Sequence, residues 1–324
     1  MTYLLVGACF CLAGFVAMDL AATGWIAVLL RLVGDGARRW SPIQRRRFFA
    51  AVRVLPCAAG LLFAALVVGP GYAWLEPRGA RESVGPMLAL VALGAIVLLA
   101  RGPLSALSAW RATRRLEITW LRVSDRLKAP EVGFPVWRVR EGSAGFWLSG
   151  LLRPRLIVSA EALDALTPVE RAAAFGHERA HAASRDNLVR LGLAACPGAL
   201  SLTSLGRRVE REWVGAAEAD ADRRAVGGSP AAAVELASAL VKVARLAPPP
   251  PAHAVAASAL GDGDINTRVR SLLAGDLSRR APLRAQAVAW AGILVPLVAV
   301  AALSLDHTVV GMLHDLAEHL VRRF

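Results

Sequence analysis

Four long apolar runs constrain the fold of this chain more than any other feature of its sequence. They lie at residues 3–33, 50–68, 84–100 and 285–305. Each has at least the roughly 17 residues that an α-helix needs to cross the hydrocarbon core of a bilayer. The first run follows no basic segment and is longer than the apolar part of a signal peptide, so we expect a retained span. The sequence therefore predicts a mainly α integral membrane protein with about four transmembrane helices.

The charged residues give these spans a direction. The 324 residues carry a net charge of +13, almost wholly from arginine, because Lys128 and Lys242 are the only lysines. Arginines concentrate at 34–53 and again at 101–128. Basic loops stay on the cytoplasmic side, so we expect a multi-pass protein of the plasma (inner) membrane with its N-terminus outside. No helix-turn-helix accompanies the basic charge, and we expect no direct nucleic-acid binding.

This topology divides the chain into four parts. We expect three transmembrane helices in residues 1–100, with a basic cytoplasmic loop at 34–49. A cytoplasmic domain follows at 101–284, then a fourth span at 285–305. Residues 306–324 form a short extracytoplasmic tail.

Two features of the apolar segments leave alternatives open. Residues 188–205 are mostly apolar, but they are short, contain Arg190 and are broken by Pro197-Gly198. They form either a buried helix pair or a re-entrant or interfacial segment. Asp19 marks a polar site within the helix bundle, or it lies near the outer interface or pairs with a neighbouring helix.

The chemistry of the chain is concentrated in His177-Glu178-Arg179-Ala180-His181. Two histidines four residues apart fall on one face of a helix, where both can bind a single Zn²⁺. Glu178 points into the same cleft and can act as catalytic base toward a water molecule at the metal. The spacing therefore predicts a zinc site with His177 and His181 as ligands.

Short β-like runs precede this motif. Residues 136–140, 146–148 and 156–158 predict a small antiparallel sheet, separated by Gly and Pro. The edge of such a sheet can hold an extended peptide by adding a strand.

Helices follow the sheet. Thr167-Pro168-Val169-Glu170 predicts a helix start with a capping box, and the helix continues to about residue 183 with both histidines on it. A second helix is expected at 207–226, ending at Gly227-Gly228. A third begins at Ser229-Pro230 and ends before the prolines at 248–251.

A catalytic zinc needs a third protein ligand, and Glu218 on the second of these helices is the best candidate. Asp222 lies four residues later, on the same helical face. Its carboxylate can accept the ring N–H of a zinc-binding histidine.

The segment from Gly145 to Leu273 resembles the membrane zinc peptidases of the BlaR/MecR antirepressor family. The resemblance rests on Gly-Leu-Leu-Arg-Pro-Arg-Leu-Ile at 150–157, the HExxH motif, Arg185-Asp186, Glu218 with Asp222, and an arginine-containing segment at 267–273. It implies a cytoplasmic α+β gluzincin-type zinc peptidase domain. His177, His181 and Glu218 would bind Zn²⁺, Glu178 would be the base, and Asp186 and Asp222 would support the ligands.

The chain also departs from the family members that give it its name. It stops about twenty residues after the last apolar run, so we expect no penicillin-binding sensor domain. Its only tyrosines, Tyr3 and Tyr72, lie outside the expected domain. His253 and Arg268 are therefore the candidates for stabilising an oxyanion.

The expected function is a membrane-embedded zinc metalloendopeptidase that cleaves a cytoplasmic or membrane-proximal protein. The resemblance implies a winged-helix transcriptional repressor as substrate, and the lipid bilayer is the second partner. A membrane peptidase of quality control or processing, similar to HtpX or the CAAX protease, shares HExxH and Glu-x-x-x-Asp. A zinc-binding transducer without turnover is a third interpretation. The sequence leaves the oligomeric state open.

Overall fold

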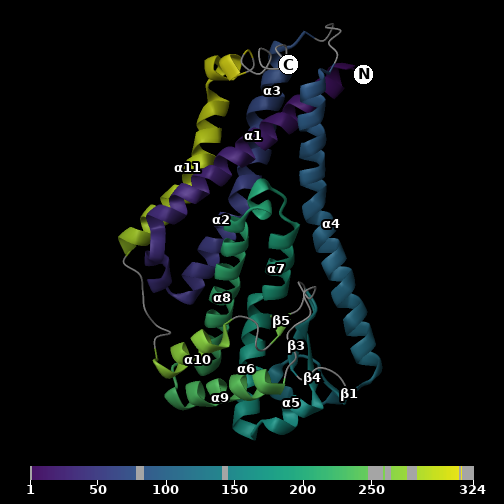
Figure 1. Ribbon diagram of the computed structural model, residues 1–324, viewed down its shortest axis with the longest axis vertical. Coiled ribbons are helices and arrows are strands. Elements are labelled where there is room, and N and C mark those ends of the chain that lie inside the picture. The colour runs from purple at the N-terminus through teal and green to yellow at the C-terminus, as the bar shows by residue number, and fades with distance from the viewer. Residues whose placement is uncertain are drawn as a thin grey trace.

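The computed structural model describes residues 2–77, 84–140, 145–246, 258–259, 264–275, 283–313 and 315. Long helices form one end of the molecule, and a smaller domain of helices and one sheet forms the other (Figure 1). The proline run at 248–251, His253 and residues 316–324 of the expected tail lie outside the described residues.

Among the described residues, four helices are long and apolar enough to cross a membrane. They are α1 (Thr2–Val33), the continuous run of α2 (Pro42–Phe63), η2 (Ala64–Val68) and α3 (Gly69–Leu75), then α4 (Pro86–Arg122) and α11 (Leu283–Leu305). Many of their large apolar side chains are exposed, including Leu90, Leu93 and Val298. A bilayer would cover these side chains. The expectation of about four membrane helices is confirmed at this level.

Helix α4 is longer than the third apolar run predicts. The run ends at Ala100, but the helix continues through Pro103 to Arg122. Its 37 residues are about 55 Å long at 1.5 Å per residue, against about 30 Å for the hydrocarbon core. The second half of α4 is therefore a stalk that joins the membrane helices to the smaller domain.

The smaller domain contains a five-stranded sheet of order β1-β2-β4-β3-β5. The strands are β1 (Ser124–Leu127), β2 (Val136–Val139), β3 (Phe146–Ser149), β4 (Arg155–Ser159) and β5 (Ser258–Ala259). The prediction of a purely antiparallel sheet is wrong, because β2 and β4 pair in parallel. The β3–β4 hairpin folds so that β4, whose Leu156, Ile157 and Val158 are fully buried, lies between β2 and β3. Burial on both faces favours that central place.

Helices pack against this sheet and against one another. They are α5 (Ala160–Ala165), α6 (Pro168–Ser184), α7 (Asp186–Ala195), α8 (Ser204–Val226), α9 (Pro230–Leu246) and α10 (Ile265–Leu273), with short 3₁₀ turns η1 (Gly34–Arg39), η3 (Pro130–Val132) and η4 (Ala199–Leu202). Phe146 and Leu156 of the sheet share one apolar core with Phe175 of α6 and with Leu236 and Leu240 of α9. This core fixes α6, which carries the two motif histidines.

Residues 188–205 form a hairpin that turns back between the long helices. Helix α7 ends at Ala195, and the chain returns through η4 into α8. At the turn, the Ala199 N–H donates to Oδ2 of Asp19 in α1 over 2.7 Å. The Arg53 guanidinium of α2 donates to the Cys196 carbonyl over 2.9 Å. The segment is thus a helix pair that begins and ends on the side of the domain, and Asp19 bonds to its turn.

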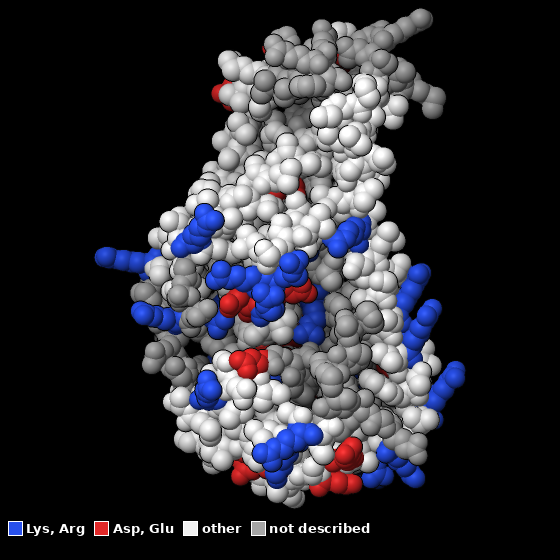
Figure 2. All heavy atoms as spheres, in the orientation of Figure 1, with Lys and Arg blue, Asp and Glu red and all other residues white. Residues whose placement is uncertain are grey.

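Charge is distributed unevenly over the visible face. Figure 2 shows lysine, arginine, aspartate and glutamate side chains over the middle and lower parts, while the upper part, built from the long helices, is mostly without them. This separation matches a bilayer around the upper helices.

Candidate metal centre

Helix α6 places the two motif histidines on one buried face. Its start is held by Thr167, whose hydroxyl accepts from the Glu170 N–H, and by Glu170, whose carboxylate accepts from the Thr167 N–H. The helix then continues without interruption to Ser184. His177 and His181 therefore lie one turn apart, and both are almost completely shielded from solvent.

Helix α8 brings Glu218 against this pair. The Nε2 atoms of His177 and His181 are 3.0 Å apart. Nε2 of His177 lies 3.5 Å from one Glu218 carboxylate oxygen, and Nε2 of His181 lies 3.5 Å from the other. Among the described residues these three form a group that can hold a metal ion.

The dimensions of this donor triangle, in which each histidine faces a different Glu218 oxygen, suit zinc. Zinc bonds of about 2.0–2.1 Å at tetrahedral angles separate neighbouring donor atoms by about 3.3 Å. The observed separations of 3.0 and 3.5 Å bracket that value. Two imidazole nitrogens and a carboxylate also form a donor set that zinc commonly takes.

Two aspartates hold the histidine rings from behind. Nδ1 of His177 lies 2.9 Å from the carboxylate of Asp222, and Nδ1 of His181 lies 2.7 Å from that of Asp186. A proton on each Nδ1 leaves the Nε2 lone pairs directed toward Glu218. Asp186 reaches His181 because the chain reverses at Arg185, whose backbone is left-handed at φ 52°.

Two arginines complete the buried cluster. Arg268 of α10 donates two hydrogen bonds to Asp222 and lies 2.9 Å from Glu218. Arg46 of α2 lies 2.6 Å from Asp186. From the sequence, Arg46 belongs only to a basic segment that indicates topology, because no local pattern relates it to a residue 140 positions later. Buried carboxylates require cationic partners, and for Arg46 that requirement is the one general signal.

The cluster has an excess of negative charge that a divalent cation would neutralise. Glu178, Asp186, Glu218 and Asp222 face the guanidinium groups of Arg46 and Arg268. With neutral histidines, the carboxylates of Asp186, Glu218 and Asp222 against two arginines leave one negative charge, and Glu178 adds a second when it is ionised. Such an excess of negative charge in a buried place is unfavourable without a counter-ion.

The pKa shifts of the two histidines also indicate surroundings that favour positive charge. Burial by itself lowers the pKa of His181, but the carboxylates of Glu218 and Asp186 outweigh it and raise the pKa to about 10. Burial is likewise outweighed for His177 by Asp222 and Glu218, which raise its pKa. The surroundings therefore stabilise positive charge at both ligands.

Glu178 differs from the other carboxylates. It is completely buried, and in the described part of the chain neither of its oxygens has a hydrogen-bond partner. Burial raises the pKa of its carboxyl to about 7, against the opposing effect of the two histidines. A carboxyl with a pKa near neutrality can both accept and return a proton, as general acid–base catalysis requires.

The sheet edge nearest β3 is already paired. Ser258 and Ala259 of β5 lie opposite Leu148 and Trp147 of β3 in antiparallel register. In the described sheet β1 and β5 are the outer strands, and binding of an extended peptide at an edge stays a prediction. Arg268, one of the two oxyanion candidates, is placed against Glu218 and Asp222; His253 lies outside the described residues.

Comparisons with known proteins add no identification. No family model matches the chain, and no curated protein sequence matches it.

Proposed function

We propose that this chain is a membrane-embedded zinc metalloendopeptidase that cleaves a protein at or near the membrane surface. One observation carries the proposal: Glu178 lies buried, with both oxygens unpartnered among the described residues, beside a donor triangle of zinc dimensions. A purely structural metal site needs no such carboxylate.

Each residue then has a distinct task. His177, His181 and Glu218 would hold the ion, and Asp222 and Asp186 would keep the two imidazole rings oriented toward it. Zinc bound there would polarise the scissile carbonyl and lower the pKa of a bound water molecule. Glu178 would take a proton from that water and deliver it to the leaving amine.

The positions of the basic segments favour a cytoplasmic location for the domain that carries the metal centre. Arg45, Arg46 and Arg47 lie in the basic segment at the start of α2, and Arg111, Arg114 and Arg115 lie on the stalk of α4. Both groups belong to the domain end of the molecule, and basic segments stay inside. We place the domain in the cytoplasm and the N-terminus outside on this basis.

The substrate that best fits this position is a cytoplasmic transcriptional repressor of the winged-helix type, with the chain acting in signalling. The motif resemblance and the proposed cytoplasmic position of the domain favour this substrate. A quality-control peptidase would use the same groups on unfolded membrane proteins.

The test uses the purified full-length chain in detergent, its zinc content measured by mass spectrometry, and cleavage of fluorescently labelled casein. Glu178→Gln is expected to keep the metal and lose cleavage by about 10²–10⁴-fold, since it removes the proton acceptor alone. Glu218→Ala is expected to lose both zinc and cleavage, because it removes a ligand.

The matched control is Glu210→Gln, an exposed glutamate on the same helix as Glu218, which should change neither quantity. Undiminished cleavage by Glu178→Gln would remove the catalytic assignment, and a full zinc complement in Glu218→Ala would remove the ligand.

A second function is favoured by one feature, the near-complete burial of the whole centre, in which no ligand is more than 2% exposed. Closed zinc sites are typical of structural metals. A wild-type chain that binds zinc tightly and cleaves no tested protein would support a non-catalytic membrane transducer.

A further inference from the structure

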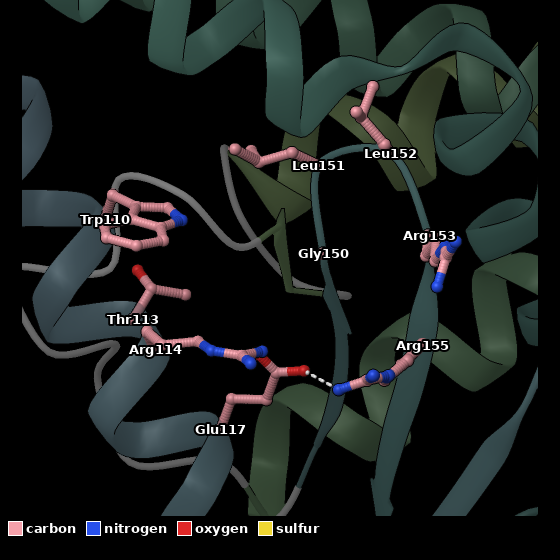
Figure 3. Close-up of a pocket in the computed structure, with 9 residues that line it drawn as sticks. All are labelled: Trp110, Thr113, Arg114, Glu117, Gly150, Leu151, Leu152, Arg153 and Arg155. Atoms are coloured by element: carbon pink, nitrogen blue, oxygen red, sulfur yellow. Dashed lines mark hydrogen bonds and ion pairs between the residues drawn. The ribbon is translucent and has the colours of Figure 1, made fainter.

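A pocket separate from the metal centre lies between the stalk of α4 and the turn that joins β3 to β4. It has a volume of about 410 Å³. Its lining residues are Trp110, Thr113, Arg114, Glu117, Gly150, Leu151, Leu152, Arg153 and Arg155. Figure 3 shows the α4 residues on one side of the space and the residues of the turn on the other.

The position of the pocket along α4 places it at the level of the membrane surface. Leu104, Leu107 and Trp110 follow one another at helical spacing on the outer face and are 62%, 38% and 40% exposed. From Met87 to Trp110 the helix rises about 35 Å. A hydrocarbon core of about 30 Å that begins at Met87 therefore ends near Leu107. Arg101 lies about 9 Å before that end and is exposed, so its long side chain would extend along the helix to the headgroups. Trp110 falls in the headgroup layer, where tryptophan is enriched in membrane proteins.

The turn opposite α4 is apolar at its tip. Leu152 is 74% exposed, and Leu151 is partly exposed beside it. Two successive leucines at the tip of a tight turn are unfavourable in water, and exposed apolar patches mark contact surfaces. A membrane surface at the height of Trp110 would cover both.

The charge of the pocket selects an anion. Arg114, Arg153 and Arg155 line it together with a single acidic residue, Glu117. Glu117 bonds to Arg114 over 3.1 Å and to Arg155 over 2.7 Å. The exposed guanidinium of Arg153 is not needed for that charge balance, so the lining keeps an excess of positive charge.

A buried hydroxyl group is a further indication of a ligand in this pocket. Thr113 is 8% exposed, and within the described residues its Oγ1 has no hydrogen-bond partner. Figure 3 shows it on α4 between Trp110 and Arg114. A buried hydroxyl is normally satisfied, so a missing acceptor or donor in the pocket is expected.

We propose that this pocket binds an anionic phospholipid from the leaflet that faces the domain. The phosphate lies against Arg114, Arg153 and the Thr113 hydroxyl, and the upper ends of the acyl chains lie against Trp110, Leu151 and Leu152. The membrane is present wherever this protein is, and its lipid has both the charge and the apolar chains that the lining requires.

The bound lipid would contact the β3–β4 turn, which is hydrogen-bonded to the residue next to Asp186. The Asn187 side-chain amide donates to the carbonyl of Leu148 over 2.9 Å and to that of Gly150 over 3.3 Å. Asn187 follows Asp186, which holds His181. Lipid at the β3–β4 turn therefore packs against the same turn that fixes the start of α7.

The test measures lipid binding and is independent of any proteolytic activity. The purified full-length chain is incubated with phosphatidylglycerol or with phosphatidylcholine in detergent, and retained lipids are counted by native mass spectrometry. We expect the wild-type chain to keep phosphatidylglycerol and not phosphatidylcholine. Equal retention of the two lipids would overturn the assignment without any variant.

Paired substitutions then locate the lipid. Arg114→Gln with Arg153→Gln removes two positive charges from the lining, and apparent affinity should fall about tenfold or more. The matched control, Arg111→Gln with Arg115→Gln, removes the same charge from exposed positions on α4 outside the lining. Equal losses in the two pairs would show a diffuse basic belt and no pocket.

Two further arms complete the design. Thr113→Val keeps the side-chain volume, and it should weaken lipid binding severalfold while leaving the thermal unfolding midpoint unchanged. Unchanged lipid binding would contradict the role of the hydroxyl in the pocket. Soluble glycerol 3-phosphate should fail to displace the lipid, because it lacks acyl chains. Displacement at concentrations comparable to those of the lipid would show a site for a free phosphate.

Discussion

At the scale of single residues, the candidate metal centre depends on side chains that do not belong to the donor triangle. Asp222 and Asp186 each lie within 2.9 Å of a histidine Nδ1, and each also contacts an arginine. The aspartates thereby fix which ring nitrogen carries the proton, and the arginines fix the aspartates. A metal ion would meet a geometry that is already oriented.

We expect Asp222→Asn and Asp186→Asn to weaken zinc binding about 10–100-fold each, because an amide holds the imidazole N–H less strongly than a carboxylate. Competition with a chelator of known affinity would measure the change. Glu212→Gln is the control, since this glutamate of α8 pairs with Arg45 and not with the arginines that hold Asp186 and Asp222. A loss of the same size in the control would assign the effect to damage of α8.

At the scale of secondary-structure elements, Glu170 joins the start of α6 to α9. Its carboxylate accepts from the Thr167 N–H in the capping box, from the Ser238 hydroxyl over 2.5 Å and from Lys242 over 2.7 Å. Burial by itself raises the pKa of Glu170, but Lys242, Ser238 and Thr167 outweigh burial and lower the pKa to about 2. The ionised carboxylate thus stabilises the folded domain.

The stability contributed by Glu170 should depend on pH in a defined direction. Because the pKa is lower in the folded state, the contribution is complete at pH values above about 4.5 and is lost as the pH falls toward 2. We expect Glu170→Gln to reduce the free energy of unfolding by on the order of 2 kcal/mol at pH 7 and by much less near pH 2. Denaturant unfolding in detergent at the two pH values would measure this difference in the free energy of unfolding. The control is Glu161→Gln, which changes an exposed glutamate of α5 and should leave the free energy of unfolding unchanged at both pH values. A loss in Glu170→Gln that is the same at pH 7 and near pH 2 would contradict the role of the ionised carboxylate.

The α7–α8 hairpin is the element that connects the metal centre with the long helices. Its first residue, Asp186, holds His181, its second helix carries Glu218, and its turn bonds to Asp19 and Arg53. Gly198 is required in that turn, because its φ of 138° suits glycine and an added Cβ would lie 2.7 Å from the Asp19 carboxylate.

We expect Gly198→Ala to destabilise the protein by about 1–3 kcal/mol. Gly192→Ala lies on α7 of the same hairpin, where an added Cβ meets nothing within 4 Å, and it should be neutral or slightly stabilising. Thermal unfolding of both variants in detergent would compare them. Equal midpoints would mean that the turn does not depend on its contact with Asp19.

At the scale of the whole molecule, the distribution of arginine predicts the orientation in the membrane. Single cysteines introduced at two exposed positions, Thr119 on the stalk of α4 and Thr308 beyond α11, would test it in a chain without its four native cysteines. We expect a membrane-impermeant maleimide to label Thr308→Cys in intact cells and Thr119→Cys only after permeabilisation. The reverse pattern would place the domain outside.

Local patterns determined many elements of this protein and the helical faces that carry the candidate site residues. The length of the apolar runs determined the four long helices, and the capping box at Thr167–Glu170 determined where α6 begins, because both depend on neighbours in the sequence. The spacing of His177 and His181, and of Glu218 and Asp222, placed each pair on one helical face for the same reason.

The way these elements pack together cannot be read from the local patterns. The parallel pairing of β2 with β4, the return of residues 188–205 between the long helices and the contacts of Arg46 and Arg268 with the buried aspartates join residues tens to more than a hundred positions apart. Such contacts follow from the joint burial of apolar faces and the need of each buried charge for a partner. Neither requirement has a period that can be read along the chain.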